Sequence, residues 1–152
     1  MADDAAVLTF RVDNVYAAEI LGDRAPSMPT PDQGTVDIWF GLTRSAYTEQ
    51  DTQAVVECEY RATIKSVDEA DDTEYSHLRA RVAVVMTASR PMTPEDAEND
   101  RLEPARDLAI RTAHPYLRQH LRQLSLAMGI ANVEVPVDVD DVLRAPEQPD
   151  ED

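Results

Sequence analysis

Alternating apolar and polar residues predict a first β-strand near the beginning of the chain. Leu8, Phe10 and Val12 alternate with polar residues, and this period of two is typical of a strand with one buried face. The alternation slips at Asn14, after which two apolar residues are adjacent. A slip of this kind predicts a β-bulge, beyond which the strand can extend to residue 21.

Three further stretches alternate in the same way and predict strands at residues 35–44, 52–67 and 75–88. The last two surround an acidic turn and predict an antiparallel hairpin with one apolar and one polar face, whose opposite charges pair across the strands. The expected inward residues are Ala54, Val56, Cys58, Tyr60, Ala62 and Ile64 on one strand and Leu78, Ala80, Val82, Val84 and Met86 on the other. Residues 22–34 are proline-rich and too long for a hairpin turn, so they predict a crossover within the sheet.

An amphipathic helix is expected after the strands. Its apolar residues recur at the period of a helix with one buried face, and they are Leu117, Leu121, Leu124 and Met128. Because a proline inside a helix removes a hydrogen bond, we expect the helix to restart or kink at Pro115, so that residues 105–113 form a preceding segment. Gly129 can provide the left-handed C-terminal cap. A shorter helix is expected to begin at Thr93, with Pro94 in its first position.

Together these elements predict an α+β fold in a single domain over residues 1–144. The domain is a four-stranded antiparallel sheet with one long C-terminal helix packed on one face. Residues 132–143 are expected to be extended. The acidic, proline-rich residues 145–152 are expected to form a disordered tail.

The charge of the chain argues against two classes of partner. The net charge is −16 and the pI is about 4.4, whereas binding to nucleic acid or to an anionic membrane requires a surplus of lysine and arginine. The acidity has two explanations that stay open: solvation or genome composition alone, or attraction of a basic partner. A single cysteine, no apolar run of membrane-spanning length, and acids where a signal peptide needs bases predict a cytoplasmic protein without membrane insertion.

No arrangement of residues points to catalysis. His114 and His120 are six residues apart and fall on different faces of a helix, and His77 lies on the polar face of a strand. Cys58 has the apolar parity of its strand, so we expect a buried thiol and not a nucleophile. With four glycines, the chain has no phosphate-binding loop. We therefore expect no enzymatic activity, no metal site and no cofactor.

Two stretches of the chain resemble the SecB family of export chaperones. The first is the opening strand, with Thr9-Phe10-Arg11-Val12, Val15-Tyr16, the acids Glu19 and Asp23, and Ala25-Pro26. The second is the helix and the segment after it, with Pro115-Tyr116-Leu117-Arg118 and Pro136-Val137-Asp138-Val139-Asp140. The order of strands and helix also agrees, so the similarity extends over residues 10–143. Gly22 stands where the family has an apolar residue.

The resemblance implies a Greek-key sheet and a homotetramer assembled as a dimer of dimers. It implies that unfolded polypeptides are held, without ATP, in apolar grooves between sheet and helix. In the family, acids on the polar face of the sheet dock the SecA motor, and Glu19 and Asp23 match the first of these acids. Arg79 and Arg81 stand where the family has a further acid, and they argue against such docking. Other relatives serve a toxin–antitoxin pair.

We interpret the protein as an ATP-independent chaperone, or holdase, for unfolded client polypeptides, acting in protein export or beside a toxin–antitoxin pair. The alternative is a non-catalytic adaptor or assembly protein with one defined protein partner. The expected client-binding residues are Tyr16, Ile20, Leu21, Met28, Trp39, Met86, Leu126, Met128 and Ile130. Trp39 has polar parity, so it either covers a second cluster or presents its ring on a binding face.

Overall fold

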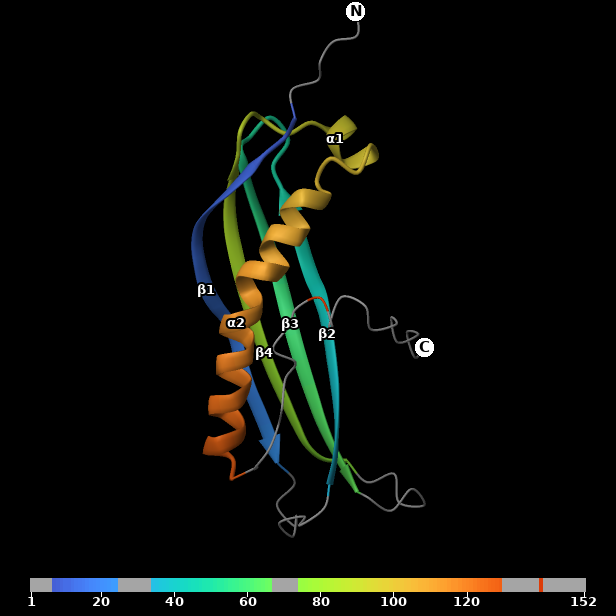
Figure 1. Cartoon of the computed structure of the whole chain (residues 1–152), viewed down its shortest axis with the longest axis vertical. Helices are drawn as coiled ribbons and strands as arrows, with labels where there is room; N and C mark the ends of the chain where they lie inside the picture. Colours follow the sequence, from blue (N-terminus) through green and yellow to red (C-terminus); the bar gives the residue numbers. More distant parts are fainter. Residues whose placement is uncertain (1–6, 25–33, 67–73, 130–139, 141–152) are drawn as a thin grey trace, which may run out of the picture.

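The computed structural model describes residues 7–24, 34–66, 74–129 and Asp140. The predicted strands are present, and each is close to its expected place: β1 (Phe10–Arg24), β2 (Gly34–Tyr47), β3 (Gln53–Ser66) and β4 (Glu74–Ala88). A short helix α1 (Pro94–Glu98) and a long helix α2 (Glu103–Ala127) follow. Figure 1 shows one curved sheet with α2 lying across one of its faces. This arrangement confirms the predicted α+β fold class.

The strands lie in the order β1-β4-β3-β2, and all neighbours are antiparallel. Three strands joined in sequence, with β1 beside the last of them, make a Greek key. β1 and β2 are therefore the two edges of the sheet, and the chain between them has to pass from one edge to the other. This topology confirms the crossover that the length of residues 22–34 predicts.

β1 contains the predicted bulge and a second one. Its register with β4 shifts between Val12 and Asn14 and again between Ala17 and Glu19. The strand continues past Leu21 to Arg24, because the alternation of inward and outward side chains resumes after each bulge.

The core lies between the sheet and α2, on what we call the inner face of the sheet. α2 packs on β4, β3 and β1. The predicted inward residues of β3 and β4 are all buried, as are Ala105, Ala109, Ala113, Leu117 and Leu121 of α2. The inward residues of the strands, which recur with a period of two, and the buried residues of α2, which recur with the helical period, therefore form one apolar layer.

The prediction of a break before Pro115 is wrong, because α2 runs without interruption from Glu103 to Ala127. A proline inside a helix costs about 3 kcal/mol. Ala113 lies just before the proline and Leu117 just after it, and both are fully buried against the sheet. Each fully buried leucine contributes about 1.5–3 kcal/mol, so packing on both sides offsets the cost. At the far end, Gly129 has the predicted left-handed conformation, with φ 69°.

The opposite, outer face of the sheet carries a network of charges. Glu59 on β3 has no exposed surface, and three arginines surround it: Arg61, Arg79 and Arg81. Arg81 Nη2 lies 3.0 Å from Glu59 Oε2, and this hydrogen bond raises the pKa of the Arg81 guanidinium. The predicted pairing of opposite charges across the strands is confirmed.

α1 begins where predicted and is fixed by a second buried acid. Thr93 N donates to Asp96 Oδ2 at 2.9 Å, and Arg90 Nη1 and Nη2 donate to the two oxygens of the same carboxylate, each at 2.8 Å. The arginine lowers the pKa of Asp96 well below its usual range, and the Thr93 bonds add to this effect. The pair orients α1 over one end of the sheet, where it borders the site described next.

Candidate functional site

The inner side of β2 carries apolar residues that lie beyond the helix. Val36, Ile38 and Phe40 are partly buried against the core, and Leu42, next on the same side, is 37% exposed. α2 packs on the three other strands, and Figure 1 shows β2 at the open side of the sheet, to the right of α2. We call these four residues the β2 shelf.

β2 is also an edge strand of 14 residues. The outer side of an edge strand presents unpaired backbone N–H and C=O groups, which can pair with an added strand. The β2 shelf therefore combines an apolar surface with a row of backbone hydrogen-bonding groups. These are the two features that an extended polypeptide needs in order to bind.

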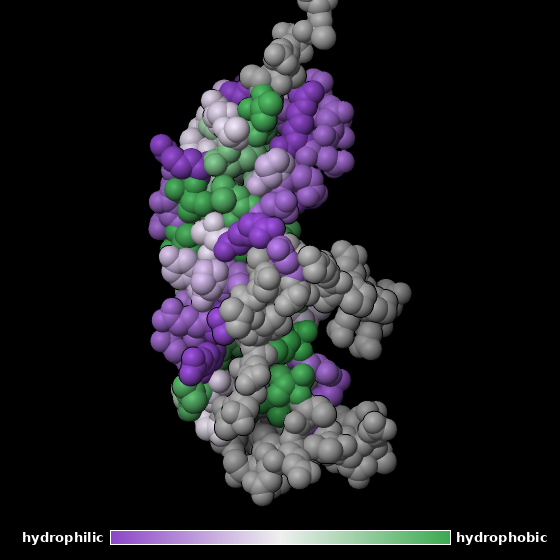
Figure 2. Space-filling model, in the orientation of Figure 1, coloured by the Kyte–Doolittle hydropathy of each residue, from purple (hydrophilic) through white to green (hydrophobic). Residues whose placement is uncertain are grey.

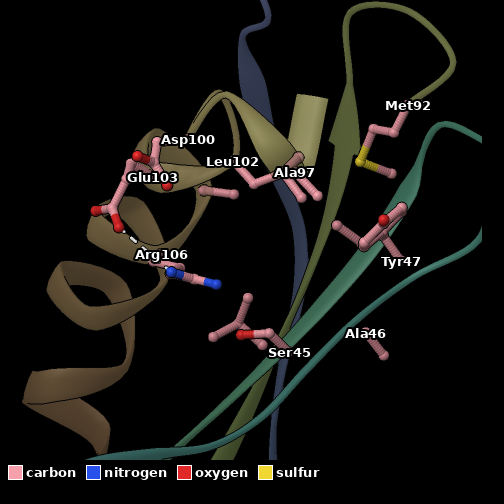
Figure 3. Close-up of a pocket in the computed structure, with 12 residues that line it drawn as sticks. Ser45, Ala46, Tyr47, Met92, Ala97, Asp100, Leu102, Glu103 and Arg106 are labelled. Carbon is pink, nitrogen blue, oxygen red and sulfur yellow. Dashed lines mark hydrogen bonds and ion pairs between the residues drawn. The ribbon is translucent and has the colours of Figure 1, made fainter. Parts of the chain in front are cut away.

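A cavity of about 120 Å³ opens at the end of the β2 shelf, where β2 passes beneath α1. We call it the α1 cavity. Its lining consists of Ser45, Ala46, Tyr47, Ala54 and Val56 from the strands, Met92 from the segment between β4 and α1, and Ala97, Asp100, Leu102, Glu103, Ala105 and Arg106 from the helical side. In Figure 3, Met92 and Tyr47 lie on the strand side, and Asp100 and Glu103 lie together on the helical side. The cavity is thus mostly apolar, with charges at one rim.

The charged rim follows from how the chain passes from α1 to α2. Asp100 has a left-handed backbone, with φ 56°, a conformation that aspartate tolerates better than most residues. This reversal places Asp100 close to the first turn of α2, where Glu103 Oε1 accepts a hydrogen bond from Arg106 Nη1 at 3.3 Å. Among the described residues, the Asp100 carboxylate has no hydrogen-bond or ion-pair partner.

Four of the predicted client-binding residues are exposed and lie at the β1 side of the molecule. They are Tyr16 (47%), Ile20 (45%), Leu21 (52%) and Leu126 (64%). The bulges turn Tyr16 and Leu21 to the outer face and Ile20 to the inner face, as their partners on β4 show. This edge is apolar on both sides, but it is separated from the β2 shelf by the width of the sheet.

Met128 is half-buried at the end of α2, and Gly22 on β1 explains its position. A Cβ atom at Gly22 would collide with Met128 Sδ and would lie 3.0 Å from Leu124 Cδ1. The glycine therefore lets the last turn of α2 approach β1 closely. This close contact explains why residue 22 is a glycine in this chain, at the position where the SecB pattern has an apolar residue.

Met86 does not belong to an exposed surface. It is 0% exposed within the core between β4 and α2, so in this structure a client cannot reach it while α2 stays in place. Trp39 is half-buried on the outer face, where its ring lies 4.7 Å from the Arg61 guanidinium and covers Gly41. Trp39 thus covers a charge cluster. Met28 and Ile130 lie outside the described residues.

The two predicted docking acids have different surroundings. Glu19 Oε1 lies 3.2 Å from Arg79 Nη1, and Glu19 Oε2 lies 3.9 Å from Arg81 Nη1. Asp23 is exposed and faces His77 on β4. The charge of Glu19 is therefore balanced by the arginines that distinguish this chain from the SecB pattern.

The buried polar side chains near α2 belong to the core between the sheet and the helix. Tyr60 Oη on β3 and His114 Nδ1 on α2 are 2.9 Å apart in the core, and burial raises the pKa of Tyr60. Burial also raises the pKa of the Cys58 thiol to about 12. Among the residues that the structure describes, no group of histidine, cysteine and carboxylate side chains could hold a metal ion, and no helix is long and apolar enough to cross a membrane.

Sequence reasoning missed the α1 cavity. Its lining comes from five separate stretches of the chain, so no local pattern marks it. The only signal is indirect: Thr93-Pro94 predicts a helix in the linker. β2 itself continues to Tyr47, beyond its predicted end, after a register shift between Leu42 and Arg44.

Comparison with known proteins supports the fold alone. No protein-family model matches the chain, and no curated protein matches it in sequence. Among solved structures, the chain is similar to the SecB-like chaperone Rv1957 of Mycobacterium tuberculosis, solved in complex with a ChAD peptide from the HigA1 antitoxin Rv1956. The TM-score is 0.63, with 11% sequence identity over 84% of this chain and 89% of that one. The two proteins share a fold, and the predicted SecB-like architecture is confirmed.

Proposed function

We propose that this protein is an ATP-independent chaperone that binds non-native polypeptides in extended form, without catalysing a reaction. The observation that carries the proposal is the β2 shelf: an edge strand whose inner side is apolar and lies beyond the cover of α2. An extended client can pair with the backbone of β2 and place alternate side chains on the shelf. The shared fold with a chaperone whose structure contains a bound peptide supports this proposal.

Aggregation of several unrelated, chemically unfolded clients tests the proposal. With the purified protein at micromolar concentration and no nucleotide, light scattering should rise more slowly for each client. A variant with Phe40 and Leu42 both changed to Ser should protect less, because the shelf loses apolar surface. Changing exposed Thr43 and Arg44 to Ser is the matched control on the same strand and should leave protection unchanged. Absence of protection by the wild-type protein for all clients would refute the proposal.

A second candidate is an adaptor for one defined partner, and the antitoxin peptide bound to the Rv1957 structure favours it. An adaptor would protect a single protein, for example an antitoxin encoded beside its toxin, and would leave unrelated clients unprotected. Docking of a SecA-like motor through Glu19 and Asp23 stays a prediction, and the arginines opposite Glu19 speak against it.

We also propose a homotetramer built as a dimer of dimers, in the cytoplasm. The exposed apolar residues of the β1 edge and of α2 (Tyr16, Ile20, Leu21 and Leu126) are suited to contacts between copies. Light scattering coupled to size-exclusion chromatography should give a mass near four times 16.9 kDa. A monomer would contradict this part of the proposal and leave client binding to be judged separately.

A further inference from the structure

The outer face of the sheet carries more arginine than its buried acid needs. The Glu59 carboxylate lies among three arginines, which are Arg61, Arg79 and Arg81. Glu19 contacts the last two of them. Three positive charges are thus shared between two carboxylates. Because the whole chain has 30 acids and only 14 lysines and arginines, this local surplus of positive charge runs against the composition.

A second cavity, of about 230 Å³, opens on the outer face beside this charge network. We call it the outer cavity. Its polar lining consists of Asp23 from β1, Arg61 and Thr63 from β3, and His77 and Arg79 from β4. Figure 2 shows the molecule from the side of α2, so the outer cavity lies on the face that is turned away from the viewer. The sheet therefore separates it from the β2 shelf.

The register of the strands brings two of the arginines together. Arg61 on β3 lies directly opposite Arg79 on β4, and Thr63 lies opposite His77. Side chains in directly opposite positions have Cβ atoms about 4.5–5.5 Å apart, and like charges placed there destabilise a sheet. Glu59 reduces this repulsion on one side of the pair. An anion in the outer cavity would reduce it on the other side.

Both arginines keep N–H groups that the network does not use. Arg61 contacts Glu59 through Nε alone, and its Nη1 and Nη2 have no hydrogen-bond or ion-pair partner among the described residues. Arg79 uses Nε and Nη1 for the two acids, which leaves Nη2. The Trp39 ring, whose centroid is 4.7 Å from the Arg61 guanidinium, holds that group from one side. Fixed guanidinium donors that remain accessible are suited to binding an anion.

We propose that the outer cavity binds the phosphate group of a phosphate monoester. A planar carboxylate is occupied by the fork of one guanidinium, whereas a phosphate has three terminal oxygens and a charge of about −1.5 to −2 at neutral pH. It can therefore accept hydrogen bonds from Arg61, from Arg79 and from the Thr63 hydroxyl, which has no partner within the described part of the chain. This site does not depend on the proposed binding of clients.

The size of the cavity leaves room beyond the phosphate. Its volume of about 230 Å³ exceeds the roughly 150 Å³ of a cavity that holds benzene. The first atoms of the group that carries the phosphate therefore also fit. That group is either a small molecule or a phosphorylated side chain of a protein, and the two sources present the same chemistry to the site.

Asp23 limits the affinity. Its carboxylate is exposed on the β1 side of the cavity, opposite His77, and it repels an anion. We therefore expect weak binding, with a dissociation constant of about 1 mM at low salt. Removal of this charge should tighten the binding of an anion. It would weaken binding if the cavity were a site for a cation.

Trp39 provides the readout, because it is the only tryptophan of the chain and lies against Arg61. Its fluorescence should change saturably with β-glycerophosphate at low, constant ionic strength, and isothermal titration calorimetry should give the same dissociation constant. Acetate at the same ionic strength should bind about tenfold more weakly. Equal affinity for acetate would overturn the proposal, as would a phosphate monoester that changes neither the fluorescence nor the heat.

A capped tripeptide with phosphoserine at its centre distinguishes the two sources of the phosphate. If it binds more tightly than β-glycerophosphate, the ligand is a phosphorylated side chain, because the peptide backbone adds contacts. If it binds equally or more weakly, the ligand is a small monoester. The unphosphorylated tripeptide is the control and should not bind. Equal binding of the phosphorylated and unphosphorylated peptides would contradict recognition of phosphate.

Variants separate the outer cavity from general attraction of charge. Arg61→Gln and Arg79→Gln each remove one guanidinium from the lining and should weaken β-glycerophosphate about fivefold. Arg44→Gln removes the same charge from an exposed position on the outer side of β2, outside the lining, and should have almost no effect. Calorimetry is the readout here, since loss of Arg61 changes the surroundings of Trp39, and circular dichroism checks the fold. Equal effects of all three variants would refute the site.

Three finer changes test its geometry. Arg61→Lys keeps the charge but loses the fork, and should weaken binding about threefold. Thr63→Val removes the hydroxyl and should weaken binding about threefold, whereas Thr63→Ser should bind like the wild-type protein. Asp23→Asn should tighten binding about threefold. If Asp23→Asn weakens binding, or if none of these variants differs from the wild-type protein, the phosphate does not occupy the outer cavity.

Discussion

β3 presents Cys58, Tyr60 and Ala62 to one face of the sheet and Glu57, Glu59 and Arg61 to the other. On the inner face, burial comes from a second layer, because α2 covers the apolar side chains. On the outer face no described helix is present, yet Glu59 is as completely buried as Tyr60. Its cover is a set of three arginine side chains, whose guanidinium groups lie against the carboxylate and remain partly exposed to water.

This difference shows which apolar surfaces of the sheet a partner could reach while the protein stays folded. On the outer face, arginine side chains pair with carboxylates of the same sheet. On the inner face, α2 covers the apolar side chains. The remaining apolar surface of the sheet lies at its edges: the β2 shelf with the α1 cavity on one side, and the exposed residues of β1 on the other. The proposed function assigns one of these edges to client polypeptide and the other to contacts between copies.

The largest expected effect is on the inner face. Leu117→Ala should lower the free energy of unfolding by about 3–5 kcal/mol, because it leaves a void under α2 next to Pro115. Tyr116→Ala is the control, since that side chain is 47% exposed and should cost less than about 1 kcal/mol. Urea denaturation measures both. Similar losses for the two variants would mean that the inner face is not the dominant source of stability.

A smaller loss is expected on the outer face. Glu59→Gln keeps the shape of the side chain but leaves three arginines around a neutral amide. We expect a cost of about 2 kcal/mol, reduced from the usual value for a buried ion pair because the arginines are partly exposed. Glu57→Gln, on the same face of the strand, should change stability by less than about 0.5 kcal/mol. If Glu59→Gln is neutral, the network contributes no stability and the comparison of the two faces has to be revised.

The strands and the inner face could be predicted because their information is local. Alternation fixes which side chains of β3 and β4 share a face, and every predicted inward residue is buried. Charge pairing on the outer face followed from the same parity. The burial of Glu59 could not be predicted, because it depends on where arginines of a neighbouring strand place their ends. The helix break at Pro115 was predicted wrongly since the local cost of proline is visible in a sequence, whereas the packing that offsets it is not.

The site was harder to predict than the fold. Met86 was predicted to bind clients because methionine suits adaptable grooves. Its place in the alternation of β4 puts it among the inward residues, and the structure buries it in the core. Tyr16, Ile20 and Leu21 are exposed as a binding role requires, although they lie at the opposite edge from the β2 shelf. The α1 cavity joins residues from separate elements, and only the assembled fold reveals it.

The exclusion of water from the inner face can be tested through the pH dependence of the free energy of unfolding. The Cys58 thiol has its pKa raised to about 12 by burial, against about 8.5 in an unfolded chain. Because the folded pKa is the higher one, this contribution to stability is complete below pH 8.5 and is lost as the pH rises toward 12. Relative to Cys58→Ala, the wild-type protein should lose about 2 kcal/mol between pH 8 and pH 10. Parallel stability curves for the two proteins would mean that the thiol is accessible to water in the folded state.

The smallest expected effect lies at the border between the inner face and the β1 edge. Gly22→Ala places a Cβ against Met128 and Leu124, and we expect a cost of about 1 kcal/mol, since the methionine side chain can move partly aside. In a Met128→Ala background the same change should cost almost nothing or stabilise the strand, because alanine restricts the unfolded chain more than glycine does. Thermal unfolding of the four proteins in this double-mutant cycle measures the coupling between the two residues. A coupling near zero would show that the last turn of α2 is not held against β1, and that the β1 edge is then open for client binding as well as for assembly.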